Sequence, residues 1–167
     1  MAEIDRFPTE GFTLTETVED TGSSLLAKAY HLGLGRQCLI KASCLETEKD
    51  CLKSEATLLT ECKNEAVAEL VDQCSRGRWY FLAIELISGY SLEQKIWQGI
   101  DLNLLVSIFK QFVSLLELFH SLNFSLRGVS AKDLLIRNEF SLIISNLSGL
   151  QKIETFLPVS YTHLRAH

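Results

Sequence analysis

The sequence is poor in proline and glycine, with 2 prolines and 9 glycines among its 167 residues. This scarcity excludes collagen-like and linker-like chains, which are dominated by these two residues. Positive charge is also in deficit, because 16 Lys and Arg residues stand against 21 Asp and Glu residues, a net charge of −5. A nucleic-acid-binding protein normally carries a basic face. We therefore expect no nucleic-acid partner.

The cysteines lack the spacing of a metal or redox site. There is no C-x-x-C pair, and no Cys/His cluster has the spacing of a zinc site. Reduced thiols in a cytoplasmic protein are the expected state. The five cysteines are Cys38, Cys44, Cys51, Cys62 and Cys74.

Long hydrophobic runs are missing as well. The first eleven residues lack the apolar core of a signal peptide. The longest apolar stretch, around 102–122, is interrupted by polar or charged residues that include Ser107, Lys110, Gln111, Ser114, Glu117 and His120. It is too polar for a membrane span, so we expect no membrane contact within this sequence.

What is present fits one folded domain of ordinary size, with 47% hydrophobic and 22% charged residues. Alternating apolar residues predict strands, the i, i+3, i+4 pattern predicts helices, and Ser91 with Gln94 forms a capping-box sequence. The fold class is therefore α+β. Strands are expected at 12–18, 24–30, 37–42, 134–136 and 141–144, a strand pair at 78–86, a turn at 138–139, and helices at 48–62, from 91 onward and at 104–122. The last helix is expected to bury one apolar stripe, formed by Leu105, Ile108, Phe109, Phe112, Leu116, Phe119 and Leu122.

The last ten residues have a different character. Val159 to His167 matches one translated frame of a common sequencing-library adapter, and Pro158 fits the same frame. Residues 158–167 are therefore interpreted as an adapter-derived artefact and are left out of the fold prediction.

Several motifs together resemble a eukaryotic-type protein kinase domain, as found in bacterial serine/threonine kinases. The run Cys38-Leu39-Ile40-Lys41 resembles the family's V-A-I-K strand, Glu55 stands where a helix supplies the partner of that lysine, and 79–92 resembles the hinge. The resemblance implies a protein-kinase-like fold with a small β-rich N-lobe and one main helix, followed by the first part of a helical C-lobe. The implied boundaries are an N-terminal extension at 1–11, the N-lobe at 12–86, and the hinge and partial C-lobe at 87–157.

The resemblance also implies a nucleotide pocket, but a degraded one. In the glycine-rich loop only Gly22 remains, while Glu19 and Asp20 would bring negative charge toward a polyphosphate. In the family's adenine slot, Leu39 replaces a small alanine. The implied nucleotide-binding residues are Gly22, Leu39, Lys41, Glu55, Glu85, Ile87 and Leu135.

The catalytic positions are less well kept. In the loop that resembles H-R-D-x-K-P-x-N, Arg127 is retained, Gly128 replaces the aspartate that serves as base, and Ser130 replaces the lysine. Glycine cannot accept a proton. Asp133 and Asn146 are the implied metal ligands with their identities exchanged, and a neutral amide is a poor ligand for Mg²⁺. A register one residue earlier would place Asn146 where an apolar residue belongs.

By contrast, the apolar framework is retained. Leu59, Leu126 and Leu147 fall at positions that the family uses for a buried column between its lobes. The sequence thus predicts a truncated protein-kinase-like domain that is a pseudokinase, with a regulatory or scaffolding role toward protein partners and no cofactor. Two alternatives remain: an atypical active serine/threonine kinase that uses ATP and Mg²⁺, and a relative that phosphorylates small molecules.

We predict that the native reading frame continues past about Leu157 into further helices. The adapter-like tail and the missing remainder of the implied C-lobe motivate this expectation, and the exposed helix 104–122 should make the 167-residue chain prone to aggregate. Sequencing the complete gene tests it. A natural stop codon directly after His167 would contradict it.

Overall fold

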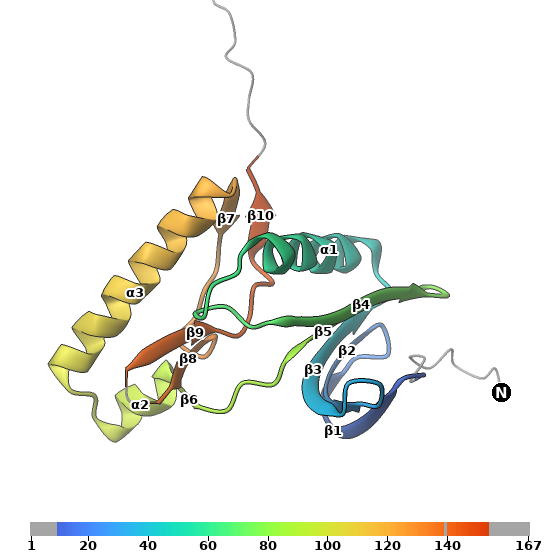
Figure 1. Cartoon of the computed structure of the whole chain (residues 1–167), viewed down its shortest axis with the longest axis horizontal. Helices are drawn as coiled ribbons and strands as arrows, with labels where there is room; N and C mark the ends of the chain where they lie inside the picture. Colours follow the sequence, from blue (N-terminus) through green and yellow to red (C-terminus); the bar gives the residue numbers. More distant parts are fainter. Residues whose placement is uncertain (1–9, 139, 154–167) are drawn as a thin grey trace, which may run out of the picture.

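The computed structural model describes residues 10–138 and 140–153, and it is a mixed α+β structure, as predicted (Figure 1). The expected artefact tail at 158–167, most of the N-terminal extension and Glu139 of the expected turn lie outside the described residues.

An antiparallel sheet of five strands forms the first half, in the order β1-β2-β3-β5-β4. The predicted strands at 12–18, 24–30 and 37–42 are confirmed. The predicted strand pair at 78–86 is wrong, because this stretch is one strand whose partner lies upstream. That partner was missed because its residues are largely polar and only partly buried. The strands are β1 (Phe12–Asp20), β2 (Ser24–His31), β3 (Arg36–Ser43), β4 (Leu70–Arg76) and β5 (Trp79–Glu85).

Strand β5, which lies between β3 and β4, is buried on both faces, and this explains its continuous apolar sequence. Its alternation sends Phe81 and Ala83 into a cluster between β1, β2 and β3. Leu82 and Ile84 point the opposite way, into a larger cluster shared with the helices and short strands. One strand therefore belongs to both cores.

Helix α1 (Glu46–Glu61) covers the sheet, as the pattern at 48–62 predicted. It buries Ala56, Leu58 and Leu59, and Cys62 ends it by donating its backbone N–H to the Leu58 carbonyl. Two glutamates in the first turn stabilise the helix, because their negative charges lie at the positive end of the helix dipole. The helix packs against β3, β4, β5 and β10, so one of its faces looks into the centre of the molecule.

The second half begins with the predicted capping box. The backbone N–H of Gln94 donates to Ser91 Oγ at 3.2 Å, and Ser91 N–H donates to Gln94 Oε1 at 3.0 Å. The strands expected at 134–136 and 141–144 are confirmed, whereas three strands of two or three residues were too short to predict. The elements are β6 (Tyr90–Ser91), α2 (Leu92–Gln98), α3 (Leu102–Ser121), β7 (Phe124–Leu126), β8 (Leu134–Arg137), β9 (Ser141–Ile144) and β10 (Leu150–Lys152).

Helix α3 buries only part of its apolar surface. Ile108, Leu115 and Phe119 lie in the larger core, but Phe109, which the sequence pattern placed on the buried stripe, is 64% exposed. The apolar arc of the helix is wider than the face that β7 and β9 cover. By length and composition alone α3 could cross a membrane, a test that the core helix of a soluble protein also passes.

A close backbone approach fixes the segment before β8 against the segment after β9. Arg127 N–H donates to the Gly149 carbonyl at 3.0 Å. A Cβ at position 149 would lie 1.6 Å from the Arg127 carbonyl oxygen, so only glycine fits. This contact holds the loop 127–133 beside Asn146 and thereby assembles the candidate site.

Candidate functional site

A buried ion pair forms the centre of the site. Lys41 Nζ lies 2.6 Å from Glu55 Oε1, and the two side chains are 12% and 2% exposed. The alternation of β3 places Lys41 on the face opposite Cys38 and Ile40, toward α1. The ion pair that the sequence predicted between these two residues is therefore present.

The pair continues into the second half of the molecule. Lys41 Nζ donates to Asn146 Oδ1 at 3.5 Å, and Asn146 Nδ2 donates to Asp133 Oδ1 at 2.9 Å. Leu147, the next residue, is buried in the larger core. Leu147 therefore packs in the core, while Asn146 beside it belongs to the polar network.

Asp133 is also held from its own loop. Both the backbone N–H and the hydroxyl of Ser130 donate to Asp133 Oδ2, at 2.8 and 2.7 Å. Burial raises the pKa of Asp133. Hydrogen bonds from Ser130 and Asn146 and the charge of Lys41 lower it by more than burial raises it, so the pKa lies below its ordinary value. The carboxylate is therefore ionised at neutral pH, and both of its oxygens accept hydrogen bonds from protein donors.

These hydrogen bonds compete with metal binding. Asn146 turns its amide nitrogen, a donor, toward Asp133, while its oxygen accepts from the Ser148 backbone N–H at 3.1 Å as well as from Lys41. A divalent cation shared by the two side chains would have to displace the Asn146 donor. Within residues 10–138 and 140–153 no group of three His, Cys, Asp or Glu residues could hold a metal ion.

The positions expected to carry the chemistry contain no proton acceptor. Gly128 has no side chain, and its φ of +69° is a left-handed conformation that suits glycine. Arg127 is exposed, and the Ser130 hydroxyl is engaged by Asp133. The loop therefore has no group at 128 that could activate a hydroxyl.

A cavity of about 310 Å³ opens beside the ion pair. Among its charged lining residues, Glu19, Glu48 and Glu55 outnumber Lys41, so the cavity repels a polyphosphate. Gly22 does not line it, and its N–H donates to Asp20 Oδ1 at 2.8 Å in the turn between β1 and β2. The uncharged lining residues are Ser24, Leu25, Leu26, Ala42, Ser43, Cys51, Leu52 and Ser148.

The remaining predicted residues lie along the connection after β5. Glu85 forms a close ion pair with Arg137 of β8, a partner that the sequence did not reveal. Ile87 and Leu39 pack against the larger core. Leu135 stands opposite Ile143 in the β8–β9 pair. The structure thus brings Lys41, Glu55, Asp133 and Asn146 into one network but leaves Gly22 outside it.

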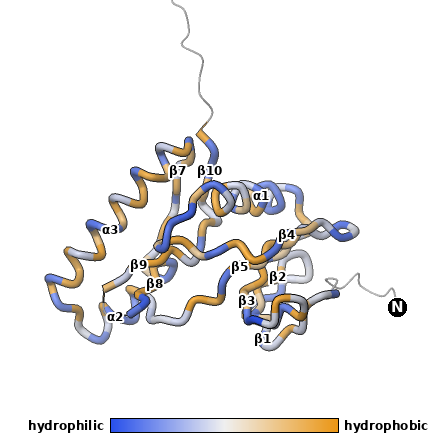
Figure 2. Tube along the Cα trace, viewed as in Figure 1, coloured by the Kyte–Doolittle hydropathy of each residue, from blue (hydrophilic) through white to orange (hydrophobic). Residues whose placement is uncertain are grey.

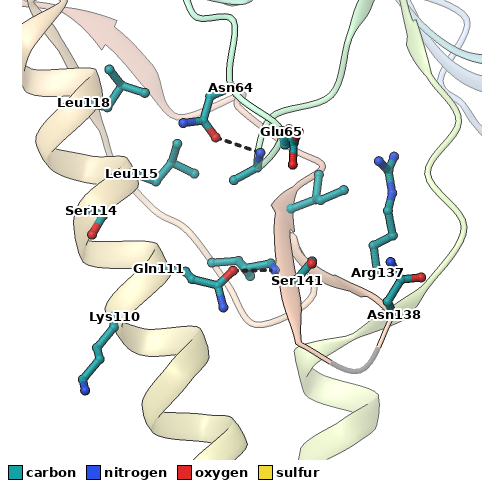
Figure 3. Close-up of a pocket in the computed structure, with 13 residues that line it drawn as sticks. Asn64, Glu65, Lys110, Gln111, Ser114, Leu115, Leu118, Arg137, Asn138 and Ser141 are labelled. Carbon is teal, nitrogen blue, oxygen red and sulfur yellow. Dashed lines mark hydrogen bonds between the residues drawn. The ribbon is translucent and has the colours of Figure 1, made fainter.

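A second cavity, of about 610 Å³, lies between α3, the loop after α1 and the β8–β9 hairpin (Figure 3). Gln111 closes one side, because its Oε1 accepts from Leu142 N–H at 3.1 Å and its Nε2 donates to the Phe140 carbonyl at 2.7 Å. The side-chain amide thereby occupies the free edge of β9. None of the predicted site residues lines this cavity.

Comparison with known proteins identifies no relative: no family model matches the chain, and no curated protein sequence matches it.

We predict that Lys41→Met lowers the free energy of unfolding by about 3–5 kcal/mol, because Glu55 would be left buried without its partner. The double variant Lys41→Met/Glu55→Leu should recover most of this loss, since it removes both buried charges. Urea unfolding at neutral pH measures both.

The control is Lys28→Met, which breaks an exposed ion pair with Glu16 and should change stability by less than about 1 kcal/mol. Equal losses for Lys41→Met and Lys28→Met would show that the central pair does not organise the fold.

Proposed function

We propose that the chain is part of a protein-kinase-like domain that acts as a pseudokinase, a regulatory or scaffolding module that works through its shape. Two features support the kinase-like assignment. A five-stranded antiparallel sheet with one covering helix precedes a helical segment, and Lys41 of the third strand pairs with Glu55 of that helix. In a kinase this lysine holds the nucleotide phosphates.

The single observation that carries the loss of catalysis is the continuous side-chain network from Glu55 through Lys41, Asn146 and Asp133 to Ser130. Each polar group that would meet a nucleotide or a metal already has a protein partner. The Lys41–Glu55 pair is kept in active kinases, but a phosphate on Lys41 would have to displace Asn146, and a metal ion would have to break the hydrogen bond between Asn146 and Asp133. The absence of a general base at Gly128 also argues against catalysis.

The charges near the network disfavour a nucleotide further. Glu19 and Glu48 line the cavity where a polyphosphate would approach Lys41. Lys41 is the one cation among the described lining residues of this cavity, and it is already paired with Glu55. The same features argue against the alternatives of an atypical serine/threonine kinase and of a small-molecule phosphotransferase, which both need ATP and Mg²⁺.

We predict negligible ATP binding at millimolar concentration, with or without Mg²⁺, and no phosphate transfer above background. Calorimetric titration measures the binding, and transfer of labelled phosphate to a generic substrate or to the protein itself measures the activity. Restoring the acid with Gly128→Asp should not rescue transfer, because Asn146 and Ser130 remain. Micromolar ATP affinity or robust Mg²⁺-dependent transfer would favour the active-kinase alternative.

The variant Leu39→Ala tests the blocked adenine slot. Leu39 packs against the larger core beside Ile84, its cross-strand neighbour, so its truncation should lower the free energy of unfolding by about 2 kcal/mol or more. The same variant should gain weak adenine binding, because overfilling a packed site typically costs about 1–3 kcal/mol.

Leu34→Ala is the matched control, since Leu34 lies exposed in the β2–β3 turn, and it should change neither stability nor binding. Thermal unfolding with and without adenosine reads out both effects. A stable Leu39→Ala variant that ignores adenosine would contradict the blocked-slot interpretation.

A further inference from the structure

Helix α3 carries an apolar surface that its own fold does not cover. Leu102, Val106, Phe109 and Val113 are all exposed, with Leu102 at 71% and Phe109 at 64%. The helix lies at the outer edge of the molecule (Figure 1), and hydrophobic residues recur along its length (Figure 2). This surface is distinct from the buried face formed by Ile108, Leu115 and Phe119.

The exposed residues follow the spacing of a helix-pairing seam. From Leu102 to Val113 they are separated by four, three and four positions, and the same rhythm continues through Leu116 and the exposed His120. A repeat averaging 3.5 residues keeps apolar side chains on one line along a helix and is typical of contacts with a second helix. We call Leu102, Val106, Phe109, Val113, Leu116 and His120 the outer seam.

We propose that the outer seam is a homodimer interface, in which α3 packs antiparallel against α3 of a second copy of this chain. A two-fold arrangement requires a self-complementary surface. In antiparallel pairing centred on position 111, Phe109 faces the partner's Val113, Val106 faces the partner's Leu116, and Leu102 faces the partner's His120. In each of these facing pairs except the outermost, Leu102 with His120, both side chains are apolar.

Charge selects this register and orientation. Lys110 and Glu117 directly follow the seam residues Phe109 and Leu116 and are exposed. Neither belongs to an ion pair within the described residues. In the antiparallel register centred on position 111, the side chains at these flanking positions lie next to each other across the interface. Lys110 therefore forms an ion pair with the partner's Glu117. Because the dimer has two-fold symmetry, this ion pair occurs twice.

The other arrangements lack this complementarity. Sliding one helix by seven residues in the antiparallel pair brings Lys110 opposite the partner's Lys110, or Glu117 opposite the partner's Glu117. A parallel pair would instead place Lys110 beside the partner's Leu105 and Glu117 beside the partner's Phe112, which leaves both charges without an opposite. No residue of the candidate site takes part in the interface. The proposal competes, however, with the expectation that helices following residue 157 cover α3, and in that case a longer chain that includes those helices is a monomer.

Sedimentation equilibrium of the 167-residue chain over a range of concentrations tests the proposal. The expected result is a reversible monomer–dimer equilibrium. Phe109→Glu should abolish the dimer, since it buries two charges at the centre of the seam. Lys110→Glu or Glu117→Lys alone should raise the dissociation constant at least about tenfold, because each creates like-charge contacts twice.

The charge-swap variant Lys110→Glu/Glu117→Lys is the most discriminating test. It recreates both ion pairs with reversed charges, so it should restore the dimer. Two variants outside the seam serve as controls. Trp97→Ser removes an 84% exposed aromatic side chain of α2, and Lys63→Glu reverses an exposed charge after α1. Both should leave the equilibrium unchanged.

Three outcomes would overturn the proposal. The first is a monomer at every concentration, including a monomer that binds lipid vesicles through α3 instead. The second is a dimer that Phe109→Glu does not affect. The third is failure of the charge swap to restore what the single reversals weaken. Circular dichroism of each variant checks that the exposed substitutions leave the monomer folded.

Discussion

The ion pair between Lys41 and Glu55 is the contact on which the arrangement of this protein depends. A buried carboxylate is tolerated only when a partner neutralises it, so α1 must sit where Glu55 reaches the middle of β3. Because Asn146 contacts the same lysine, the segment after β9 is fixed relative to the sheet as well. One lysine thus connects the sheet, its covering helix and the second half of the chain.

The consequence for function is that the polar side chains of the site form hydrogen bonds with one another when no ligand is bound. Asn146 lies between Lys41 and Asp133, with its oxygen toward the cation and its nitrogen toward the carboxylate. In our proposal this amide takes the place that a metal ion and a phosphate would take in an active kinase. A domain built in this way holds one shape in the absence of nucleotide, which suits a module that acts by binding protein partners.

The sequence predicted the features that local patterns determine. Alternation located β1, its expected hairpin partner was β2, and a short apolar run located β3. Helical spacing located α1 and α3, and the pair Ser91–Gln94 located the start of α2. It missed β4, whose polar residues hide its pairing with β5, and it placed Phe109 in a core that does not extend so far. Among the site contacts, Lys41–Glu55 was expected from the resemblance to kinase motifs. The Ser130–Asp133 contact depends on the conformation of its loop, and Arg137–Glu85 depends on how two strands distant in sequence are placed.

The most direct measurement is a crystal structure of the protein grown in the presence of millimolar ATP and Mg²⁺. Our account predicts that Lys41 keeps its contact with Asn146, that Asn146 remains on Asp133, and that no nucleotide density appears beside Leu39. Phosphates on Lys41 and a metal ion between Asp133 and Asn146 would contradict it. Such a structure would show that the network is only the resting arrangement of a working nucleotide site.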